Sequence, residues 1–472
     1  KRANRVLGVF HPTEAPDRAP IPASRDWPAA LEAFKGDGEG VRLGEAFEPS
    51  PQNIEARLVR RELANGIRAA LLPKKTRGGR VLASLTLHWG DEQSLAHREA
   101  ACSYAGHMLM RGTKRLSRTQ LKDAFERLNA SVSVGGEGAS IEVRRENLPA
   151  ALRLVAEVLR EPAFSPAEFE EMKRAAITGA EAQRTDPSAR ASETLTRHLT
   201  EYPPGHPHYT PTVDEKIRWL REATLHDAVA CYRELFGATA ADFVAVGDFD
   251  PDEVAKLAED LFGPWKTPHP FKRVPTRYFE VPPTVEKVVT PDKANAVLRA
   301  GLNMPVRDDH PDFPALVLAN YLLGGSSTAR IPARVREKEG LSYSTFTSFT
   351  SSYFDQNAAF RVGSIFAPQN RERVRAALRE ELERAVREGF GAEEIESGKR
   401  ALLEARRMQR THDRALAGRL ANYLFAGRTF AWDIEFERQI AALTPGAVHA
   451  ALKRHLDPAK LSVVTAGDFK KN

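Results

Sequence analysis

Residues 242–249 read DFVAVGDF, and residues 461–469, near the end of the chain, read LSVVTAGDF. A second pair of stretches repeats in the same order, since SPAEFEEMKRA at 165–175 matches GAEEIESGKRA at 391–401. The closing Phe249 and Phe469 are 220 residues apart, and the second pair is offset by 226 residues, from 165 to 391. Self-similarity at one spacing in two separated places is the signature of a duplicated unit. The sequence therefore predicts one structural unit present twice.

Each unit mixes strand and helix patterns. VLASLTLHW at 81–89 and NAVLRAGLNM at 295–304 alternate as half-buried strands do. AALRLVAEVLRE at 150–161 and VRAALREELERAVRE at 374–388 have the three-and-four spacing of amphipathic helices. We therefore expect the α+β class: two tandem homologous domains, each with a mixed, mainly antiparallel sheet packed with helices.

Proline-rich passages divide the chain. Residues 11–51 hold seven prolines and the GDGEG run, and GPWKTPHPFKRVPTRYFEVPP occupies 263–283. The 472 residues are too many for one ordinary domain. We expect an extended connector at 1–54, a first domain at 55–264, a linker at 265–285 and a second domain at 286–472.

Composition excludes several classes of protein. With 42% hydrophobic and 28% charged residues the chain is globular, and no run of about 18 apolar residues predicts a membrane span. The net charge of +6 is spread along the chain without a basic block, which disfavours nucleic-acid binding. Two cysteines are too few for a disulfide scaffold and leave the redox compartment open. The chain does not begin with Met, so we expect a processed or shortened start.

Three further stretches indicate a family. HMLMRGT at 107–113, GHPHYTPTVDE at 205–215 and LGGSSTARIPARVREKEGLSY at 323–343, with the duplication, resemble the insulinase/pitrilysin-type (inverzincin) zinc metallopeptidases. The resemblance extends from about residue 55 to the end. It implies half of a clamshell-like peptidase, and NRVLGVFHPTEAPDRAPIP at 4–22 resembles the connector of the longer fused members.

The metal motif of that family is degenerate here. Active members carry H-x-x-E-H on a helix, where two His side chains four residues apart grip Zn²⁺ and the Glu takes a proton from the bound water. The aligned residues are Ser103, Tyr104, Ala105, Gly106 and His107, so one His remains. The resemblance suggests Glu181 as a remnant of the third ligand. One imidazole and one carboxylate fall short of a catalytic zinc site, so we expect no metal in this chain.

Other constellations favour structural roles. His206 and His208 lie in a proline-rich loop without a third ligand at a supporting interval, and their role is left open. Cys102 and His107 are five residues apart on a helix, so they point to different sides and do not form a nucleophile and base. LGGSS at 323–327 lacks the ending of a phosphate loop and is expected to be a turn between helices.

One motif of the family survives in the second unit. Arg336 and Tyr343 are separated by Gly340, which suits the end of a helix, so Arg336 is expected in the last helical turn and Tyr343 at the start of a strand. The resemblance implies that both reach toward the metal of the other half, bind the substrate and stabilise its oxyanion. The alternative is that the Arg complements a helix dipole and the Tyr is ordinary rim material.

The resemblance yields one functional hypothesis and one rival. The chain is expected to be the non-catalytic subunit or half of a zinc-dependent endopeptidase, inactive alone, whose peptide substrate is cut with zinc held by a partner that carries H-x-x-E-H. Arg336 and Tyr343 would be its catalytic and substrate-binding residues. The rival is a structural or peptide-binding relative with no role in hydrolysis. A bacterial periplasm or cytoplasm fits the family, and cleavage specificity stays open.

Overall fold

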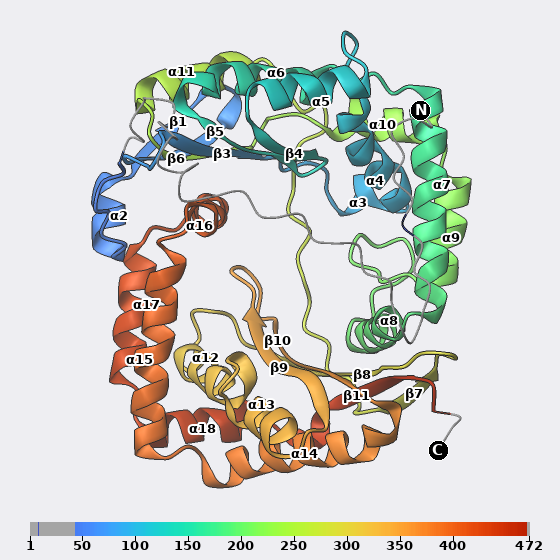
Figure 1. Ribbon diagram of the computed structural model, residues 1–472, viewed down its shortest axis with the longest axis vertical. Coiled ribbons are helices and arrows are strands. Elements are labelled where there is room, and N and C mark those ends of the chain that lie inside the picture. The colour runs from blue at the N-terminus through green and yellow to red at the C-terminus, as the bar shows by residue number, and fades with distance from the viewer. Residues whose placement is uncertain (1–7, 9–42, 470–472) are drawn as a thin grey trace, which may run out of the picture. The chain divides into compact units, whose positions relative to one another are not determined.

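The structure is a computed structural model that describes residue 8 and residues 43–469 (Figure 1). Most of the expected connector, at 1–7 and 9–42, lies outside the described residues. From Leu43 on, the described chain forms one compact unit that contains two sheets. The α+β class is confirmed.

The five-stranded second sheet repeats the topology of the six-stranded first sheet without its edge strand β1. The first has the order β1-β2-β6-β3-β5-β4 and the second the order β7-β11-β8-β10-β9. In each sheet one pair is parallel, β2 with β6 and β7 with β11, and the other pairs are antiparallel. The strands are β1 Val59–Glu62, β2 Arg68–Pro73, β3 Arg80–Thr86, β4 Ser131–Gly135, β5 Gly138–Arg144, β6 Asp242–Gly247, β7 Val285–Val289, β8 Ala296–Met304, β9 Ser342–Ser351, β10 Ala358–Phe366 and β11 Ser462–Gly467. The duplication predicted from sequence is thus present in three dimensions.

The repeated Gly-Asp-Phe ending has a steric reason. Gly247 ends β6 and Gly467 ends β11, at equivalent places in the two sheets. Gly247 has φ +138°, and a Cβ there would lie 2.4 Å from the Arg80 carbonyl oxygen on the neighbouring strand. A Cβ at Gly467 would lie 2.6 Å from the Cβ of Ala296. Both copies therefore keep glycine because the adjacent strand leaves no room for a side chain.

Helices follow the strands in the same order in both repeats. Many begin at a Ser, Thr or Asp cap or with Pro in the first turn, as in α10, whose Thr224 and Asp227 form a capping box. The α-helices are α2 Pro51–Arg57, α3 Glu92–Leu95, α4 Glu99–Met108, α5 Arg118–Arg127, α6 Leu148–Arg160, α7 Pro166–Ala182, α8 Pro187–Leu199, α9 Val213–Glu222, α10 Leu225–Leu235, α11 Pro251–Phe262, α12 Phe313–Asn320, α13 Arg330–Pro332, α14 Arg371–Glu388, α15 Ala392–Gln409, α16 Asp413–Ala426, α17 Ala431–Ala442 and α18 Pro445–His455.

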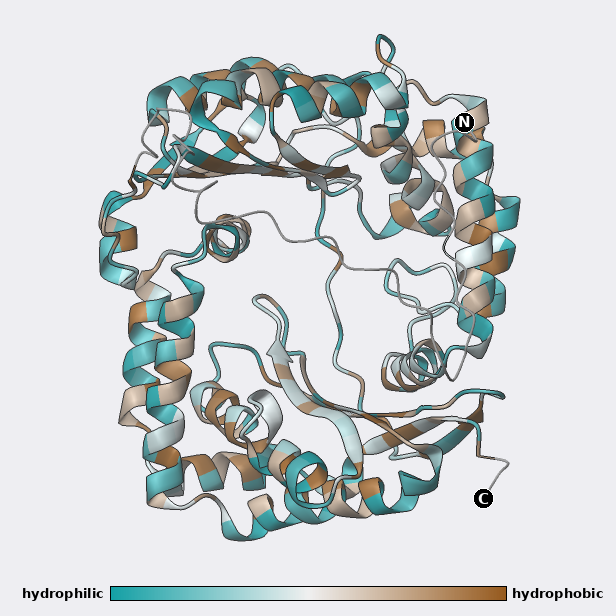
Figure 2. Cartoon of the chain, in the orientation of Figure 1, coloured by the Kyte–Doolittle hydropathy of each residue, from teal (hydrophilic) through white to brown (hydrophobic). Residues whose placement is uncertain are grey.

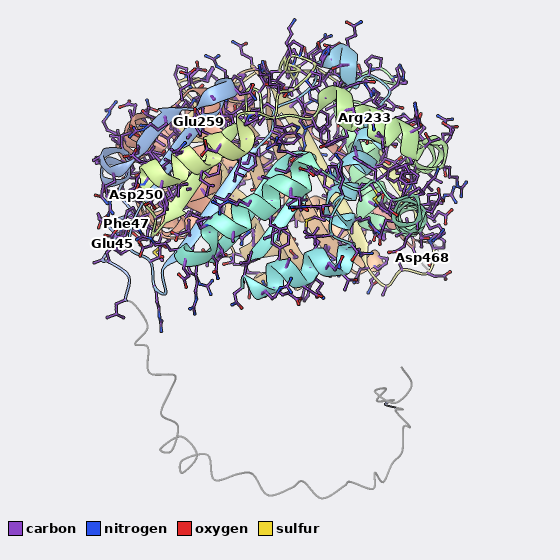
Figure 3. The ribbon with its side chains drawn as sticks, turned by 90° about the horizontal axis from the view of Figure 1, so that it is seen from above. Glu45, Phe47, Arg233, Asp250, Glu259 and Asp468 are labelled. Carbon is purple, nitrogen blue, oxygen red and sulfur yellow. A yellow bond between two sulfur atoms is a disulfide. The ribbon has the colours of Figure 1, made fainter. Side chains whose placement is uncertain are left out.

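Each sheet buries one face beneath helices of its own repeat. Alternate residues of the first sheet, such as Leu71, Ala83 and Ala245, pack in one core with α6 and α11. Figure 3 shows α11 lying across this sheet, with Asp250 at its start and Glu259 near its end. Figure 2 shows hydrophobic strands in the first sheet, and helices that carry both hydrophobic and hydrophilic residues above it. The amphipathic pattern predicted for 150–161 is confirmed by α6.

The other face of each sheet receives a helix from the opposite repeat. In the second repeat, α16 packs Leu416 and Leu420 against Leu72 and Val244 of the first sheet. Reciprocally, α8 of the first repeat places Leu195 and its neighbours against the second sheet. Figure 1 shows α16 below the first sheet and α8 above the second. This exchange couples the two repeats through their cores.

One local expectation needs correction. The segment 323–327, expected as a turn between helices, begins inside a wide helical turn at Tyr321–Gly325, and only the residues after Gly325 leave the helix. A Cβ at Gly324 would lie 2.8 Å from the backbone nitrogen of Thr347 on β9, so the glycine permits close packing of helix against strand. Among the described residues, no helix has both the length and the apolar character needed to cross a membrane.

Candidate functional site

The degenerate metal motif lies on α4, as the sequence predicts. Ser103 and His107 are both exposed, one turn apart on the same helix. The His107 Nδ1 donates to the Ser103 carbonyl oxygen at 2.7 Å, so the imidazole is bound to its own helix. The surviving histidine thus has a hydrogen-bond partner on its own helix.

Gly106 stands where active relatives carry the general base, and the structure leaves no space for that side chain. The glycine is buried against the turn between β4 and β5. A Cβ at this position would lie 2.7 Å from the Gly136 nitrogen and 3.0 Å from its Cα. Contacts this short with backbone atoms can be relieved only by moving the turn or the helix. The motif cannot regain its glutamate by a single substitution without such a shift.

Glu181, the possible remnant of the third ligand, is already paired. It lies near the end of α7 and accepts a hydrogen bond from Arg221 Nη2 at 2.6 Å. No group of three potential ligands within the described part of the chain includes His107 or Glu181. These residues do not fit a catalytic zinc, which takes three protein ligands and an adjacent general base.

Cys102 and Cys231 form a disulfide, which sequence reasoning missed. The bond joins α4 to α10 across 129 residues, with 5.4 Å between the two Cα atoms. Both cysteines are buried. The separation of the two cysteines in the sequence gave no indication that they pair, because they meet only when the two helices pack together. Cys102 is therefore a structural residue, as the sequence analysis concluded, and the bond fixes the helix that carries the degenerate motif.

The two loop histidines pack against the chain around them. His206 stacks on Tyr202, with ring centroids 4.4 Å apart, and its Nδ1 accepts a hydrogen bond from the His208 backbone N–H. Burial lowers the pKa of His206. His208 Nε2 lies 3.3 Å from the Val274 carbonyl oxygen. His206 thus packs within its own loop, and His208 contacts the segment that joins the repeats.

Arg336 lies in the last turn before Gly340, as expected, but the helix there is wider than an α-helix. Ala333–Lys338 is π-helical, and Gly340 has φ +59° where the chain turns toward β9. The Leu341 N–H donates to the Val335 carbonyl oxygen at 2.9 Å and closes the end of the helix. Irregular turns of this kind occur frequently at functional sites.

Two arginines of this turn have different roles. Arg334 pairs with Glu339, Glu380 and Glu381, which ties the turn to α14. Arg336 has 58% of its side chain exposed, and its ion pair within residues 43–469 is with the adjacent, exposed Glu337 at 3.3 Å. Arg334 therefore anchors the turn, whereas Arg336 extends into solvent.

Tyr343 is the extra residue of a β-bulge. Along the edge strand β9, Ser342 pairs with Phe366 and Ser344 with Ile365, so Tyr343 has no opposite residue on β10. Its side chain is 86% exposed, more than any other large hydrophobic side chain in residues 43–469. Bulges at sheet edges redirect side chains and are common beside active sites.

Buried hydroxyl groups hold the bulge. Ser342 Oγ accepts a hydrogen bond from Thr345 Oγ1 at 2.9 Å and lies within hydrogen-bond distance of Ser364 Oγ, also at 2.9 Å. It also lies 2.9 Å from the Ser344 carbonyl oxygen and 2.7 Å from that of Ile365. The bulge is thus a bonded feature of the strand, and Tyr343 is presented on a rigid edge. Its phenol can donate to an external carbonyl or oxyanion.

A further cluster resembles a metal site and is better explained as an ion pair. His310, Asp312 and His455 offer three potential ligand atoms within 4.8 Å of one another. Both carboxylate oxygens of Asp312 accept hydrogen bonds from Arg454, at 2.9 and 2.5 Å. The guanidinium supplies the positive charge and lowers the pKa of Asp312. A divalent cation would have to displace it.

The fold and the site define a class of protein: a duplicated α+β chain with the frame of an inverted zinc motif. The family described as "Insulinase (Peptidase family M16)" matches residues 90–211, which include the degenerate helix. The "Peptidase M16 inactive domain" matches residues 222–402, which include Arg336 and Tyr343. Together the two matches cover more than half of the chain. The chain belongs to the insulinase family, peptidase family M16, and its own copy of the zinc motif is degenerate.

Known relatives agree with this assignment. The "Non-peptidase homolog YmxG" of Helicobacter pylori is 20% identical over 374 residues, covering 77% of this chain and 84% of the relative. A crystal structure of a peptidase M16 inactive domain from Pseudomonas fluorescens has a TM-score of 0.75 at 21% identity, over 87% of this chain and 97% of that one.

A third relative is longer than this chain. The periplasmic protease PqqL of Escherichia coli matches at a TM-score of 0.69 and 16% identity, over 98% of this chain and 49% of that one. The chain therefore spans about half the length of that protein. At these identities the two solved structures establish the fold.

Proposed function

We propose that this chain is the non-catalytic half of a two-part zinc endopeptidase. In this proposal a partner, either a separate subunit or another part of a longer polypeptide, carries H-x-x-E-H and the zinc. Arg336 and Tyr343 of this chain bind the peptide carbonyl and stabilise the oxyanion that forms during hydrolysis. The division of the chain into domains at 55–264 and 286–472 belongs to the same proposal.

One observation carries the proposal: Tyr343 is held on a bonded bulge, and among the described residues its hydroxyl has no hydrogen-bond partner. A tyrosine kept only for stability would bury its ring or satisfy its hydroxyl. Arg336 supports the argument, since the neighbouring Arg334 already makes the ion pairs that hold the turn. A guanidinium and a phenol are the donors that peptide hydrolysis needs, because negative charge builds on the carbonyl oxygen.

The decisive test needs the partner. The chain is used as bait in an extract of its source, and stoichiometric recovery of a polypeptide with H-x-x-E-H is expected. In the reconstituted complex, Tyr343→Phe should lower turnover of an unfolded peptide by about ten- to a thousandfold, because one oxyanion donor is lost. Tyr278→Phe, in the segment between the repeats, is the control and should leave turnover unchanged. Full activity of Tyr343→Phe would contradict the proposed role.

A second candidate is a peptide-binding or structural relative without hydrolysis. The name of the Helicobacter pylori relative, a non-peptidase homolog, favours it. Recovery of the bait alone, or with a partner that lacks a zinc motif, would select this candidate over the first.

We further propose an oxidising compartment such as the bacterial periplasm. The buried Cys102–Cys231 disulfide supports it, because such bonds are rare where thiols are kept reduced. A periplasmic relative agrees with this location. Fractionation of the source cells, with the chain found in the cytoplasm, would overturn it.

A further inference from the structure

A cavity of about 420 Å³ lies where the β9–β10 hairpin meets α15, α16 and α17. Figure 1 shows α15 and α17 side by side, with α16 beside their upper ends. The cavity combines aromatic walls with charged groups, and its principal lining residues are Asp308, Phe313, Tyr353, Arg406, Arg419 and Trp432. No residue of this cavity belongs to the candidate site described above.

A single carboxylate beneath the cavity is shared by two arginines. Asp433 is fully buried, and its Oδ1 accepts hydrogen bonds from Arg406 Nη2 and Arg419 Nη1, both at 2.5 Å. Its Oδ2 accepts from the Tyr423 hydroxyl at 2.5 Å. Burial raises the pKa of Tyr423, so this phenol is neutral. Asp433 therefore neutralises one of two guanidinium groups.

Among the described residues that are ion-paired with these two arginines or line the cavity, the imbalance persists. Glu437 accepts from Arg406 and, through both oxygens, from Arg410. Arg428 pairs with Asp308. The wider pairs Arg273–Asp355 and Arg307–Asp309 are each neutral in themselves. The cluster thus holds four guanidinium groups, on Arg406, Arg410, Arg419 and Arg428, against three carboxylates, on Asp308, Asp433 and Glu437.

An uncompensated buried charge is costly, so the excess cation needs a partner. Arg406 and Arg419 share Asp433, and Arg419 is the more exposed of the two: 21% of its side chain is exposed, against 14% for Arg406, and its ion pair within the described chain is with Asp433 alone. The larger cavity of about 620 Å³ beside α14 and α15 is a useful contrast. There the cations are balanced by carboxylates, as in the pairs of Arg330, Arg334 and Arg384.

We propose that the 420 Å³ cavity is a carboxylate-binding subsite for a peptide, in which Arg419 forms the ion pair and Tyr353 and Trp432 contact the adjoining apolar part. Both rings are already oriented by Arg428, whose guanidinium carbon lies 5.0 and 5.3 Å from their centroids. The choice of a peptide rests on the proposed function, whereas the preference for an anion rests on the charge imbalance alone. The carboxylate is either a chain terminus or an acidic side chain.

The test uses the full chain without a partner, so its outcome is separate from that of the proposed function. Binding of three probes is measured by ligand-observed NMR: N-acetyl-Ala-Ala-Phe with a free carboxylate, its C-terminal amide, and N-acetyl-Ala-Glu-Ala amide. One or both carboxylate probes should bind, and the amide of the first should not. Arg419→Gln should weaken carboxylate binding by about 10- to 100-fold, the range for a charged hydrogen bond. Arg414→Gln, an exposed site on the same helix, is the matched control.

Three measurements test the proposed carboxylate-binding subsite: the melting temperature of the variant, probe binding by the Arg419 variants, and the preference among the probes. Arg419→Gln removes the excess positive charge, so its melting temperature should be equal to or higher than that of the native chain. If Arg419 were only a structural residue, its replacement would lower the melting temperature. If that variant fails to fold, Arg419→Lys keeps the charge without the planar fork, and the probes should bind it more weakly than the native chain. Equal binding of acid and amide, undiminished binding by the folded Arg419 variant, or binding of inorganic phosphate only would overturn the proposal.

Discussion

Gly106 shows that the packing around the degenerate zinc motif has no space for a side chain at one of its positions. Its Cα packs against the Gly136 backbone, so the helix and the β4–β5 turn have closed over the space that a glutamate would need. At the position of the general base, the packing therefore depends on a glycine.

Restoring a side chain at Gly106 should destabilise the protein. We expect Gly106→Ala to lower the free energy of unfolding by about 1–3 kcal/mol, because an overpacked contact must be relieved by backbone movement. Urea denaturation measures this. The control, Gly179→Ala, lies in α7 with no atom within 4 Å of the added Cβ, and should raise stability by about 0.5–1 kcal/mol. Ser103→His/Gly106→Glu should bind no zinc by calorimetry, and tight binding would refute this view of the site.

Glu157 gives Thr113, the last residue of HMLMRGT, a structural role. The Thr113 hydroxyl donates to Glu157 Oε1 at 2.6 Å, and Arg115 pairs with the same carboxylate. The Arg115 hydrogen bond lowers the pKa of Glu157 below its ordinary 4.5, although burial opposes it. The motif thus joins the end of α4 to α6.

This carboxylate gives a pH-dependent contribution with a defined sign. Because the folded pKa is lowered, the stabilisation is present above about pH 4.5 and is lost as the pH falls through the folded value. Glu157→Gln should cost about 1–3 kcal/mol at pH 7 and progressively less toward pH 3, as measured by urea denaturation. The exposed Glu126→Gln should change stability by less than about 0.5 kcal/mol at either pH. A pH-independent difference for Glu157→Gln would contradict the assignment.

Among the elements, α4 and α10 are joined by the one covalent link in the described chain. Removing it through Cys102→Ser/Cys231→Ser should lower the free energy of unfolding by about 2–5 kcal/mol, because the closed segment is long. Reductant should destabilise the native chain and leave the double variant unaffected. Two freely titrating thiols in the folded, unreduced protein would show that the bond does not form.

The strand β9 holds an irregularity of its register with buried hydroxyl groups. Its buried Ser342, Thr345 and Ser364 neighbours hold the bulge, and the residue between two paired positions is the most exposed aromatic of the second repeat. Alternation along 342–351 predicted the strand. It did not predict the bulge, because a bulge is defined by the register with β10.

At the scale of the whole molecule, the exchange of α8 and α16 makes each repeat part of the core of the other. Leu195 is buried against the second sheet and Leu420 against the first. A helix that completes the core of the other repeat stabilises both repeats.

We therefore expect the two repeats to unfold together. Leu420→Ala and Leu195→Ala should each cost about 2–5 kcal/mol and shift one common transition. Circular dichroism and tryptophan fluorescence during urea denaturation should give coincident curves. Met408→Ala, at a 47% exposed position on α15, should have little effect. Two separate transitions, only one of them moved by Leu420→Ala, would show that the repeats are independent.

The sequence by itself determined the duplication, the element order, the α+β class, the loss of the zinc ligands and the positions of Arg336 and Tyr343 at a helix end and a strand start. These features depend on periodicity, composition and short motifs, which are local. Only the tertiary structure decided the Cys102–Cys231 pairing, the closure over Gly106, the bulge at Tyr343, the helix exchange and the excess charge around Asp433. Each of these joins residues distant in sequence or depends on the register between strands, so no local pattern could specify it.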